Sequence, residues 1–357
     1  PLLLATRAAG GTMASGAVSR AAVEEAAGRI AAYVHRTRVF TCEQISRRAS
    51  EASGSPRRLF LKAEHEQKVG AFKIRGAINA ICQSSADYIV TQSSGNHAQA
   101  IALGCKLLGK KAIVVMPEDS PAVKVDAVRE SYGAEVRFCA PSQEAREAMS
   151  AEIVAALRKE HGAEKCEEIH PNQDSDVRVI NGQGTVAVEL LEQQPGLDAV
   201  VVSIGGGGLI SGIASYVKAA SSAHKSKKAG VLVKNPPNTP VHTMADSVKS
   251  SLGATTFPLV MEHVDAVFTA SEEEIEAATR FTMERAKQVV EPGCGLAVAV
   301  ATSARLYEAY PDLRAVGVVL CGGNVDLGNL PWMRPKRPAD GEGQPAKSRR
   351  VGQGGTD

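Results

Sequence analysis

Lys73 is the residue of this 357-residue chain whose surroundings best suit covalent chemistry. It follows Phe72 and precedes Ile74, and the residues of the next turn, 76–81, are mostly small or apolar. An isolated lysine is ordinarily a hydrated surface charge. Apolar neighbours disfavour the ammonium form, so they lower the pKa of the side chain and leave a free amine that can form a Schiff base with a carbonyl group.

A second motif, the four glycines at 205–208, could hold a phosphate group. They stand between a predicted buried strand, 198–204, and a predicted helix, 209–220, so their N–H groups can point at an anion beside a helix N-terminus. A Schiff-base lysine together with a phosphate cradle predicts pyridoxal phosphate as the cofactor. A dinucleotide fold is the competing interpretation, but its Gly-x-Gly-x-x-Gly pattern would need glycine at Ile210 or Ser211. A glycine loop that serves only packing remains open.

The composition argues against several other classes of function. The formal net charge is +2 and aromatic residues make up 4% of the chain, so neither a basic stripe nor stacking platforms for nucleic acid are predicted. No apolar run approaches the roughly 20 residues of a membrane span, so no membrane partner is expected. The seven cysteines are scattered and include no Cys-x-x-Cys pair, which predicts no zinc site and favours a reducing cytoplasm.

The framework that must position these residues is one in which strands and helices alternate. Strands are predicted at 59–64, 88–91, 111–116, 135–139, 198–204, 266–269 and 315–320, and helices at 20–35, 98–108, 122–131, 144–160, 182–191, 209–220, 271–287 and 297–310. Such alternation is typical of βαβ units and parallel sheets, so the predicted class is α/β. At the start of one helix, Ser271 and Glu274 have the spacing of a capping box.

Two domains are expected, which the length and the 44% hydrophobic content allow. Residues 88–172 would form a small domain, and residues 14–87 with 173–330 a large domain that binds the cofactor. Residues 1–13 are predicted to be a leader that is not native, because Met13 at its end is expected to be the initiator methionine. Residues 331–357 contain few apolar residues and are predicted to be a disordered tail.

Four motifs in the expected order resemble the serine racemase and serine/threonine dehydratase group of fold-type II pyridoxal-phosphate enzymes: Phe72–Ala77, Ser93–His97, Gly205–Gly208 and Cys321–Asn324. The resemblance implies a tryptophan synthase β-like fold, with two open parallel-sheet domains and the cofactor in the cleft, in a homodimer. The implied activity is racemisation of L-serine to D-serine with β-elimination of serine to pyruvate and ammonia. A plain L-serine/L-threonine dehydratase, and a catalytically impaired partner protein of this fold, remain alternatives.

The resemblance also implies roles for individual residues. Lys73 and Ser94 would be the acid/base groups on opposite faces of the substrate Cα. Cys321 would face the pyridine nitrogen, where a neutral thiol, unlike an aspartate, disfavours transamination. The other cofactor contacts would come from Phe72, Asn96, Asn172, Gly205, Gly206, Gly207, Gly208, Leu209 and Glu291, and the substrate contacts from Ser93, His97, Arg146 and Ser250.

Three departures from the family pattern change the expectation. The family's nucleotide-effector site is only partly matched, because Cys42, Glu43 and Val69 stand where hydroxyl residues are usual, so bound ATP is not predicted. Ser247 stands where the family has glycine and would be strained if φ were positive there. After residue 220 about seventeen residues are missing by comparison, the size of one strand and its turn. The acidic residue that binds a divalent metal such as Mg²⁺ in the family is missing with them. The sequence therefore predicts a splice variant or faulty gene model that is marginally stable and has no metal at that site.

Overall fold

The computed structural model describes residues 3–4, 18–120, 122–170, 176–219 and 241–333, and within them the chain forms two sheets. The strands are β1 (Leu3–Leu4), β2 (Val39–Thr41), β3 (Arg58–Lys62), β4 (Tyr88–Gln92), β5 (Lys111–Pro117), β6 (Glu135–Cys139), β7 (Cys166–Glu168), β8 (Ala199–Ser203) and β9 (Ala315–Val319). The helices are α1 (Arg20–Ile30), α2 (Glu43–Ser53), α3 (Lys73–Cys82), α4 (Asn96–Leu107), α5 (Ala122–Asp126), α6 (Gln143–His161), α7 (Val177–Gln193), α8 (Gly208–Ala219), α9 (Thr256–His263), α10 (Glu272–Phe281), α11 (Pro292–Ala301) and α12 (Ala304–Ala309).

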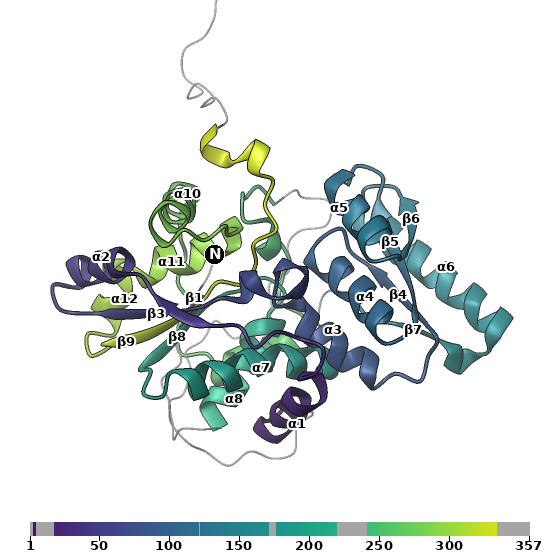
Figure 1. Cartoon of the computed structure of the whole chain (residues 1–357), viewed down its shortest axis with the longest axis horizontal. Helices are drawn as coiled ribbons and strands as arrows, with labels where there is room; N and C mark the ends of the chain where they lie inside the picture. Colours follow the sequence, from purple (N-terminus) through teal and green to yellow (C-terminus); the bar gives the residue numbers. More distant parts are fainter. Residues whose placement is uncertain (1–2, 5–17, 121, 171–175, 220–240, 334–357) are drawn as a thin grey trace, which may run out of the picture. The chain divides into compact units, whose positions relative to one another are not determined.

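The larger sheet has the strand order β1-β8-β9-β3-β2. Its three central strands, β8, β9 and β3, are parallel, and the two edge strands pair antiparallel to them. Helices α1, α7 and α8 lie on one side of this sheet, and α2, α10, α11 and α12 on the other (Figure 1). All five residues of β8 and of β9 are buried, as a sheet covered by helices on both faces requires.

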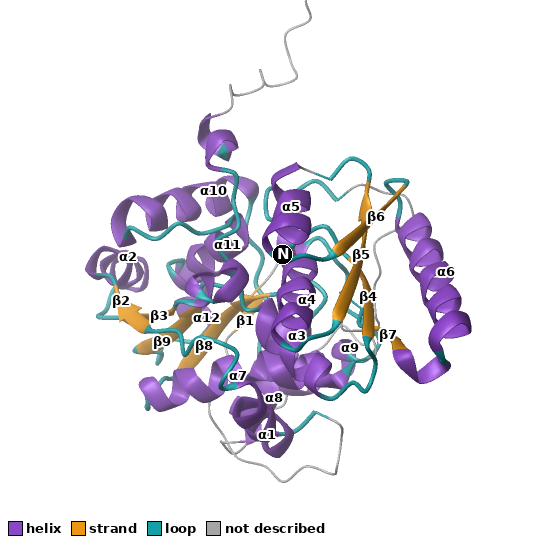
Figure 2. Ribbon diagram, turned by 45° about the vertical axis from the view of Figure 1, so that its right-hand side comes forward, coloured by secondary structure: helices purple, strands orange, loops and turns teal. Residues whose placement is uncertain are grey.

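The smaller sheet is entirely parallel, in the order β6-β5-β4-β7. Helix α6 covers one face, while α4 and α5 lie on the other (Figure 2). Under α6, Val90 and Ile113 of the sheet pack on Val154. The strands of this sheet all come from residues 88–168, and the α/β class predicted from the alternation of elements is confirmed.

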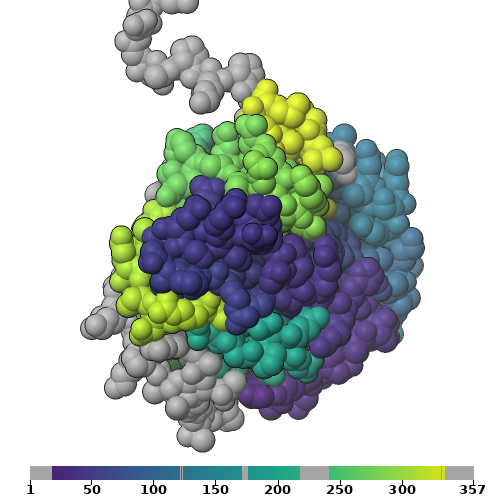
Figure 3. Space-filling view, turned by 60° about the vertical axis from the view of Figure 1, so that its left-hand side comes forward, coloured from purple at the N-terminus to yellow at the C-terminus, as the bar shows by residue number. Residues whose placement is uncertain are grey.

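Segments from opposite ends of the chain build the larger sheet and its helices. Figure 3 shows α2 in purple-blue beside α12 in yellow-green, and the two helices pack on each other. Strand β3 pairs with β9 in parallel register from Arg58↔Ala315 to Lys62↔Val319. This pairing brings the turn after β3, which leads to Lys73, next to the loop after β9, which carries Cys321.

Some local predictions are confirmed and others are wrong. The capping box at the start of α10 is confirmed, with Ser271 and Glu274 each bonded to the backbone of the other. The strand predicted at 266–269 is wrong: these residues form no strand, only a single β-bridge at Phe268, whose ring lies edge-on to Tyr310. The single helix predicted at 297–310 is two helices, α11 and α12, which Thr302 and Ser303 separate.

Several predictions concern residues outside those described. The strand that the family has after residue 220 would fall within 220–240, and the predicted tail lies mostly in 334–357, so both lie outside the described residues. Of the predicted leader, only Leu3–Leu4 is described, as β1 paired with β8. Residues 326–333 belong to a separate unit and form two short 3-10 turns. In the part of the chain that the structure describes, no helix is long and apolar enough to span a membrane.

Candidate active site

Lys73 is the first residue of α3, which lies between the two sheets in Figures 1 and 2. Backbone hydrogen bonds join the turn before it to the loop after β9. The Phe72 N–H donates to the Cys321 carbonyl at 3.1 Å, and the Gly323 N–H donates to the Gly70 carbonyl at 2.8 Å. The structure therefore fixes the backbone of Lys73 against that of Cys321.

Lys73 is partly buried, and its amino group lies 5.4 Å from the centre of the Phe72 ring. Burial lowers its pKa to about 8, and the neighbouring Cys321 and Glu291 oppose this shift. The apolar neighbours of Lys73 in the sequence predict the same lowering of its pKa. An amine with this pKa is partly unprotonated near neutral pH and can act as a nucleophile.

Asn96 and Glu291 form a hydrogen-bonded polar pair near Lys73 and Cys321. Asn96 Nδ2 donates to Glu291 Oε2 at 3.0 Å, and Asn324 Nδ2 donates to Asn96 Oδ1 at 2.9 Å. Burial raises the pKa of the Glu291 carboxyl group, while the hydrogen bonds from Asn96 and Ser247 counteract part of the rise. Ser247 is not strained, since among the described non-glycine residues only Val69 and Lys287 have positive φ.

Cys321 is a buried thiol with a second thiol beside it. Its Sγ lies 3.7 Å from Cys294 Sγ and 3.8 Å from Glu291 Oε1. The hydrogen bond with Cys294, together with burial, raises the pKa of Cys321 well above its usual value, so the thiol is neutral at pH 7. Sequence reasoning missed Cys294, although its position three residues after Glu291 could have suggested it.

The glycine tetrad joins β8 to α8, which begins at Gly208. Gly207 has φ +90°, and a Cβ there would lie 2.7 Å from Leu252 Cδ2. The first N–H groups of α8 have no acceptor within the helix and can face an anion. Thr256 closes the loop by donating from Oγ1 to the Gly206 carbonyl at 2.7 Å, a contact that no sequence motif indicated.

The tetrad lies close to the other groups. A Cβ on Gly205 would come within 2.9 Å of Val248 Cα, and the preceding residue, Ser247, bonds to Glu291. One short segment of chain therefore contacts both the glycine loop and the Glu291 carboxyl group.

The loop after β4 contributes the predicted residues Ser93 to His97. Ser93 Oγ accepts from the Gly95 N–H at 3.3 Å, and Ser94 is partly exposed. His97 is buried, with Nε2 3.3 Å from the Ile169 carbonyl and no partner at Nδ1 within the described residues. Burial, and then the charge of Lys73, lower the pKa of His97 to about 3, so the imidazole is neutral.

The remaining predicted substrate residues are less closely tied to the site. Arg146 bonds within its own helix, to the Ser142 carbonyl and to Gln143 Oε1. Ser250 is exposed and follows Ser247 by three residues. Asn172 lies outside the described residues. The roles predicted for these three residues stay predictions.

These residues fit pyridoxal phosphate. A partly buried amine of lowered pKa can bind the aldehyde, and a glycine loop at a helix N-terminus can bind the phosphate. The Asn96 amide can bind the ring hydroxyl, and the Cys321 thiol can face the ring nitrogen. In the described residues no cluster of His, Cys, Asp and Glu is suited to a metal ion.

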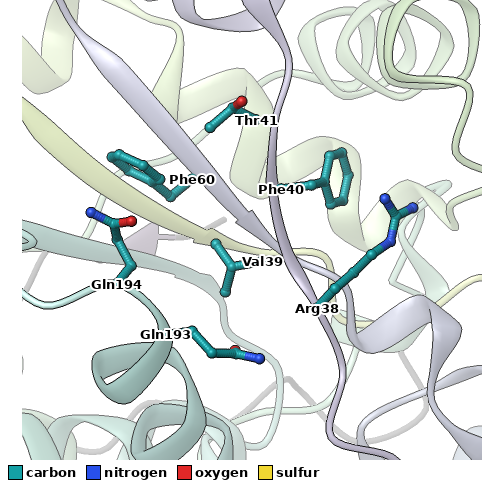
Figure 4. Close-up of a pocket in the computed structure, with 7 residues that line it drawn as sticks. All are labelled: Arg38, Val39, Phe40, Thr41, Phe60, Gln193 and Gln194. Atoms are coloured by element: carbon teal, nitrogen blue, oxygen red, sulfur yellow. The ribbon is translucent and has the colours of Figure 1, made fainter.

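A separate pocket of about 350 Å³ lies at the edge of the larger sheet, away from these groups (Figure 4). It is lined by Arg38, Val39, Phe40, Thr41, Phe60, Gln193 and Gln194. None of these is a predicted site residue.

Comparison with known proteins agrees with this set of groups. Residues 30–322 match the model of a family described as pyridoxal-phosphate dependent enzyme. Serine racemase of Mus musculus is 39% identical over 344 residues, which cover 90% of this chain and 96% of that protein.

Solved structures show the same similarity. Maize serine racemase has a TM-score of 0.78 at 37% identity and covers 89% of this chain and 97% of its own. A pyridoxal 5'-phosphate-dependent aspartate racemase has a TM-score of 0.78 at 36% identity, covering 90% and 100%. A threonine deaminase has a TM-score of 0.72 at 37% identity, covering 87% and 99%.

Proposed function

Because this chain belongs to the family of pyridoxal-phosphate dependent enzymes, we propose that it racemises L-serine to D-serine and also eliminates water from serine to give pyruvate and ammonia. Both reactions begin with removal of the Cα proton, and bound pyridoxal phosphate supplies the electron sink that makes this proton acidic. The similarity to serine racemases and to a threonine deaminase supports this pair of reactions.

The observation that carries the proposal is the environment of Lys73. Its amino group has a pKa of about 8, lowered by burial, and its backbone is bonded to the loop of Cys321. Such an amine would hold the cofactor aldehyde, and the same group would take or return a proton at one face of the substrate Cα. Racemisation needs a second acid/base on the opposite face, and Ser94 is our candidate.

The other residues would bind and orient. The first N–H groups of α8 would hold the phosphate, and Asn96 would bond the ring hydroxyl while Glu291 holds the Asn96 amide in place. The neutral Cys321 thiol at the ring nitrogen would keep transamination slow. Ser93, His97, Arg146 and Ser250 remain the proposed contacts of the substrate, with Asn172.

The experiment is incubation of the purified protein with L-serine, with D-serine and pyruvate measured together. Both products are expected, and both should be lost in Lys73→Ala. Pyruvate without D-serine would identify a plain dehydratase, and L-threonine should then be tested as substrate. A folded protein that yields neither product would be the catalytically impaired partner. L-Aspartate belongs in the same assay, since an aspartate racemase shares this fold at 36% identity.

Further proposals concern assembly, location and ions. We propose a homodimer, which size-exclusion chromatography with light scattering would test. All seven cysteines are free, which supports a reducing location such as the cytoplasm. We also propose that neither ATP nor Mg²⁺ stimulates this chain, because the motif for each is incomplete. A rise in activity with Mg²⁺ and ATP over an EDTA control would contradict this.

A further inference from the structure

Four charged side chains form a buried cluster behind the Lys73 helix: Lys62, Glu64, Arg75 and Glu189, here called the quartet. The side chains of Lys62, Glu64 and Arg75 are 0% exposed, and that of Glu189 is 12% exposed. The mechanism proposed above uses none of them. Burying four charges is costly unless they are paired and hydrogen-bonded, so their arrangement requires a reason.

The pairing within the quartet is nearly complete. Arg75 donates to both oxygens of Glu64, at 2.7 and 2.8 Å, and to both oxygens of Glu189, at 2.7 and 2.9 Å. Lys62 Nζ donates to Glu189 Oε2 at 2.6 Å and to Gln193 Oε1 at 3.0 Å. Thr37 Oγ1 donates to Glu64 Oε1 at 2.5 Å. Two cations face two anions, so the quartet is neutral as a whole.

The quartet connects the element that carries Lys73 with the strand next to the one that leads to Cys321. Lys62 ends β3, Glu64 begins the next turn, Arg75 lies on α3 and Glu189 lies on α7. On α3, Arg75 follows Lys73 by two residues, and side chains two apart on a helix point to opposite sides. The helix is therefore held on one side by Arg75, while Lys73 lies near Cys321 and Glu291 on the other. Strand β3 pairs with β9, which leads to Cys321.

We propose that the quartet is the positioning device for Lys73: it anchors the Lys73 helix at a fixed place relative to Cys321, and its neutrality allows this without a net charge behind the amino group. Other side chains could not do both. An unpaired arginine at position 75 would place a buried positive charge behind the amine and repel its protonated form, whereas an apolar residue would give up the bonds to β3 and α7. This inference rests on the proposed function of Lys73.

The charge of the quartet can be changed in both directions with isosteric substitutions on one helix. Glu189→Gln keeps the shape and leaves the quartet with one excess positive charge. Gln193→Glu, one turn further along α7, adds one negative charge at an atom that already accepts from Lys62. The double variant restores neutrality. The matched control is Glu192→Gln on the same helix, which removes an exposed carboxylate paired with Arg36.

The measured quantity is the pKa of Lys73 in the cofactor-free protein, from competitive amine labelling across pH and mass spectrometry of the Lys73 peptide. Three groups are seen to act on this amine or to feel its charge, namely Cys321, Glu291 and His97, and the variants change none of them. We expect Glu189→Gln to lower the pKa by ~0.5–1 unit, Gln193→Glu to raise it by a similar amount, and the double variant and Glu192→Gln to leave it near the wild-type value.

A purely structural cluster gives a different result. Shifts of the same sign in both single variants, or no shift in folded single variants, would overturn the proposal. Should Glu189→Gln fail to fold, the test rests on the rise of the Lys73 pKa in Gln193→Glu and its return to the wild-type value in the folded double variant. If the pKa does not rise in Gln193→Glu, or does not return in the double variant, the proposal is overturned. Labelling does not need the cofactor, so a protein that gives these shifts but makes no product refutes the proposed function alone.

Discussion

At the scale of the residue, the role proposed for one neutral thiol bears on which reactions the site would support. Cys321 has Cys294 Sγ and Glu291 Oε1 within 3.8 Å, and its raised pKa keeps it protonated at pH 7. A neutral thiol does not hold a proton on a pyridine nitrogen as a carboxylate would. The ring would then be a weaker electron sink, which favours racemisation and elimination over transamination.

Replacing Cys321 tests this directly. Cys321→Asp places a carboxylate at the ring nitrogen, so we expect less D-serine and the appearance of transamination. Transamination is measured as the conversion of the cofactor absorbance to that of its amine form. Cys321→Ser is the neutral control and should keep the wild-type product ratio. Unchanged products in the aspartate variant would mean that residue 321 does not face the ring.

The second residue-scale prediction concerns Ser94. If this hydroxyl is the acid/base on the face opposite Lys73, Ser94→Ala should lower D-serine formation by about 100-fold or more while some pyruvate formation persists, because elimination needs only one face. Chiral chromatography and a pyruvate assay on the same sample give the ratio. Equal loss of both products, with cofactor still bound, would remove Ser94 from this role. Ser131→Ala, at an exposed serine outside the predicted site, is the control.

At the scale of the element, the joint between β3, α3 and α7 depends on buried charge. Burial would raise the pKa of Glu64, but Arg75, Lys62 and Thr37 together outweigh burial and lower it below the ordinary value of 4.5. Removing one partner of such a buried pair costs about 3–5 kcal/mol, because the other charge is left without compensation. The same pairing that positions Lys73 therefore makes this joint sensitive to acid.

The pH dependence of stability follows from the sign of this shift. A carboxyl group whose pKa is lower in the folded state stabilises fully above its unfolded pKa, and that contribution is lost as pH falls through the folded pKa. We expect the free energy of unfolding to decrease as pH falls below about 4.5. In Glu64→Gln it should be lower by about 3–5 kcal/mol at pH 7 and should fall less steeply in acid. Urea melts at several pH values measure both. If the free energy of unfolding falls as steeply with decreasing pH in Glu64→Gln as in the wild type, Glu64 is not the source of the acid sensitivity.

At the scale of the whole molecule, one edge of the larger sheet is covered by an unexpected segment. Strand β8 is fully buried along its length, and Leu3–Leu4, within the predicted leader, pairs with it antiparallel as β1. The family strand that is missing by comparison would lie at 220–240, outside the described residues. The expectation of marginal stability, with no metal at that site, stays a prediction.

Deletion of residues 1–13 tests the contribution of β1. Without β1, the β8 edge presents unpaired N–H and C=O groups, which promote pairing with other chains. We expect the shortened protein to be less soluble and to aggregate at lower concentration, measured by light scattering against the full chain. Substitution of Leu3 and Leu4 by proline, with the rest of the segment kept, should have the same effect. Equal solubility of all three proteins would show that β1 is dispensable.

The sequence by itself determined the class of fold, the order of most strands and helices, the capping box of α10 and the motifs at Lys73, Ser93–His97, the glycine tetrad and Cys321. These features depend on local rules, such as the spacing of apolar residues and the turn at a run of glycines, so they can be found within a short stretch of chain. The resemblance to a known group then added the roles of single residues, which no local rule supplies.

The tertiary structure alone decided which distant groups meet. The quartet, the Cys294–Cys321 contact and the bond from Thr256 to the glycine loop each join segments far apart in the chain. The strand predicted at 266–269 is reduced to a single β-bridge at Phe268, whose ring lies edge-on to Tyr310. Nothing in the sequence alone indicates that Arg75 is buried, and only the pairing of β3, α3 and α7 shows it fully buried between two carboxylates. Burial and charge pairing are properties of assembled segments, so they could not be derived from spacing along the chain.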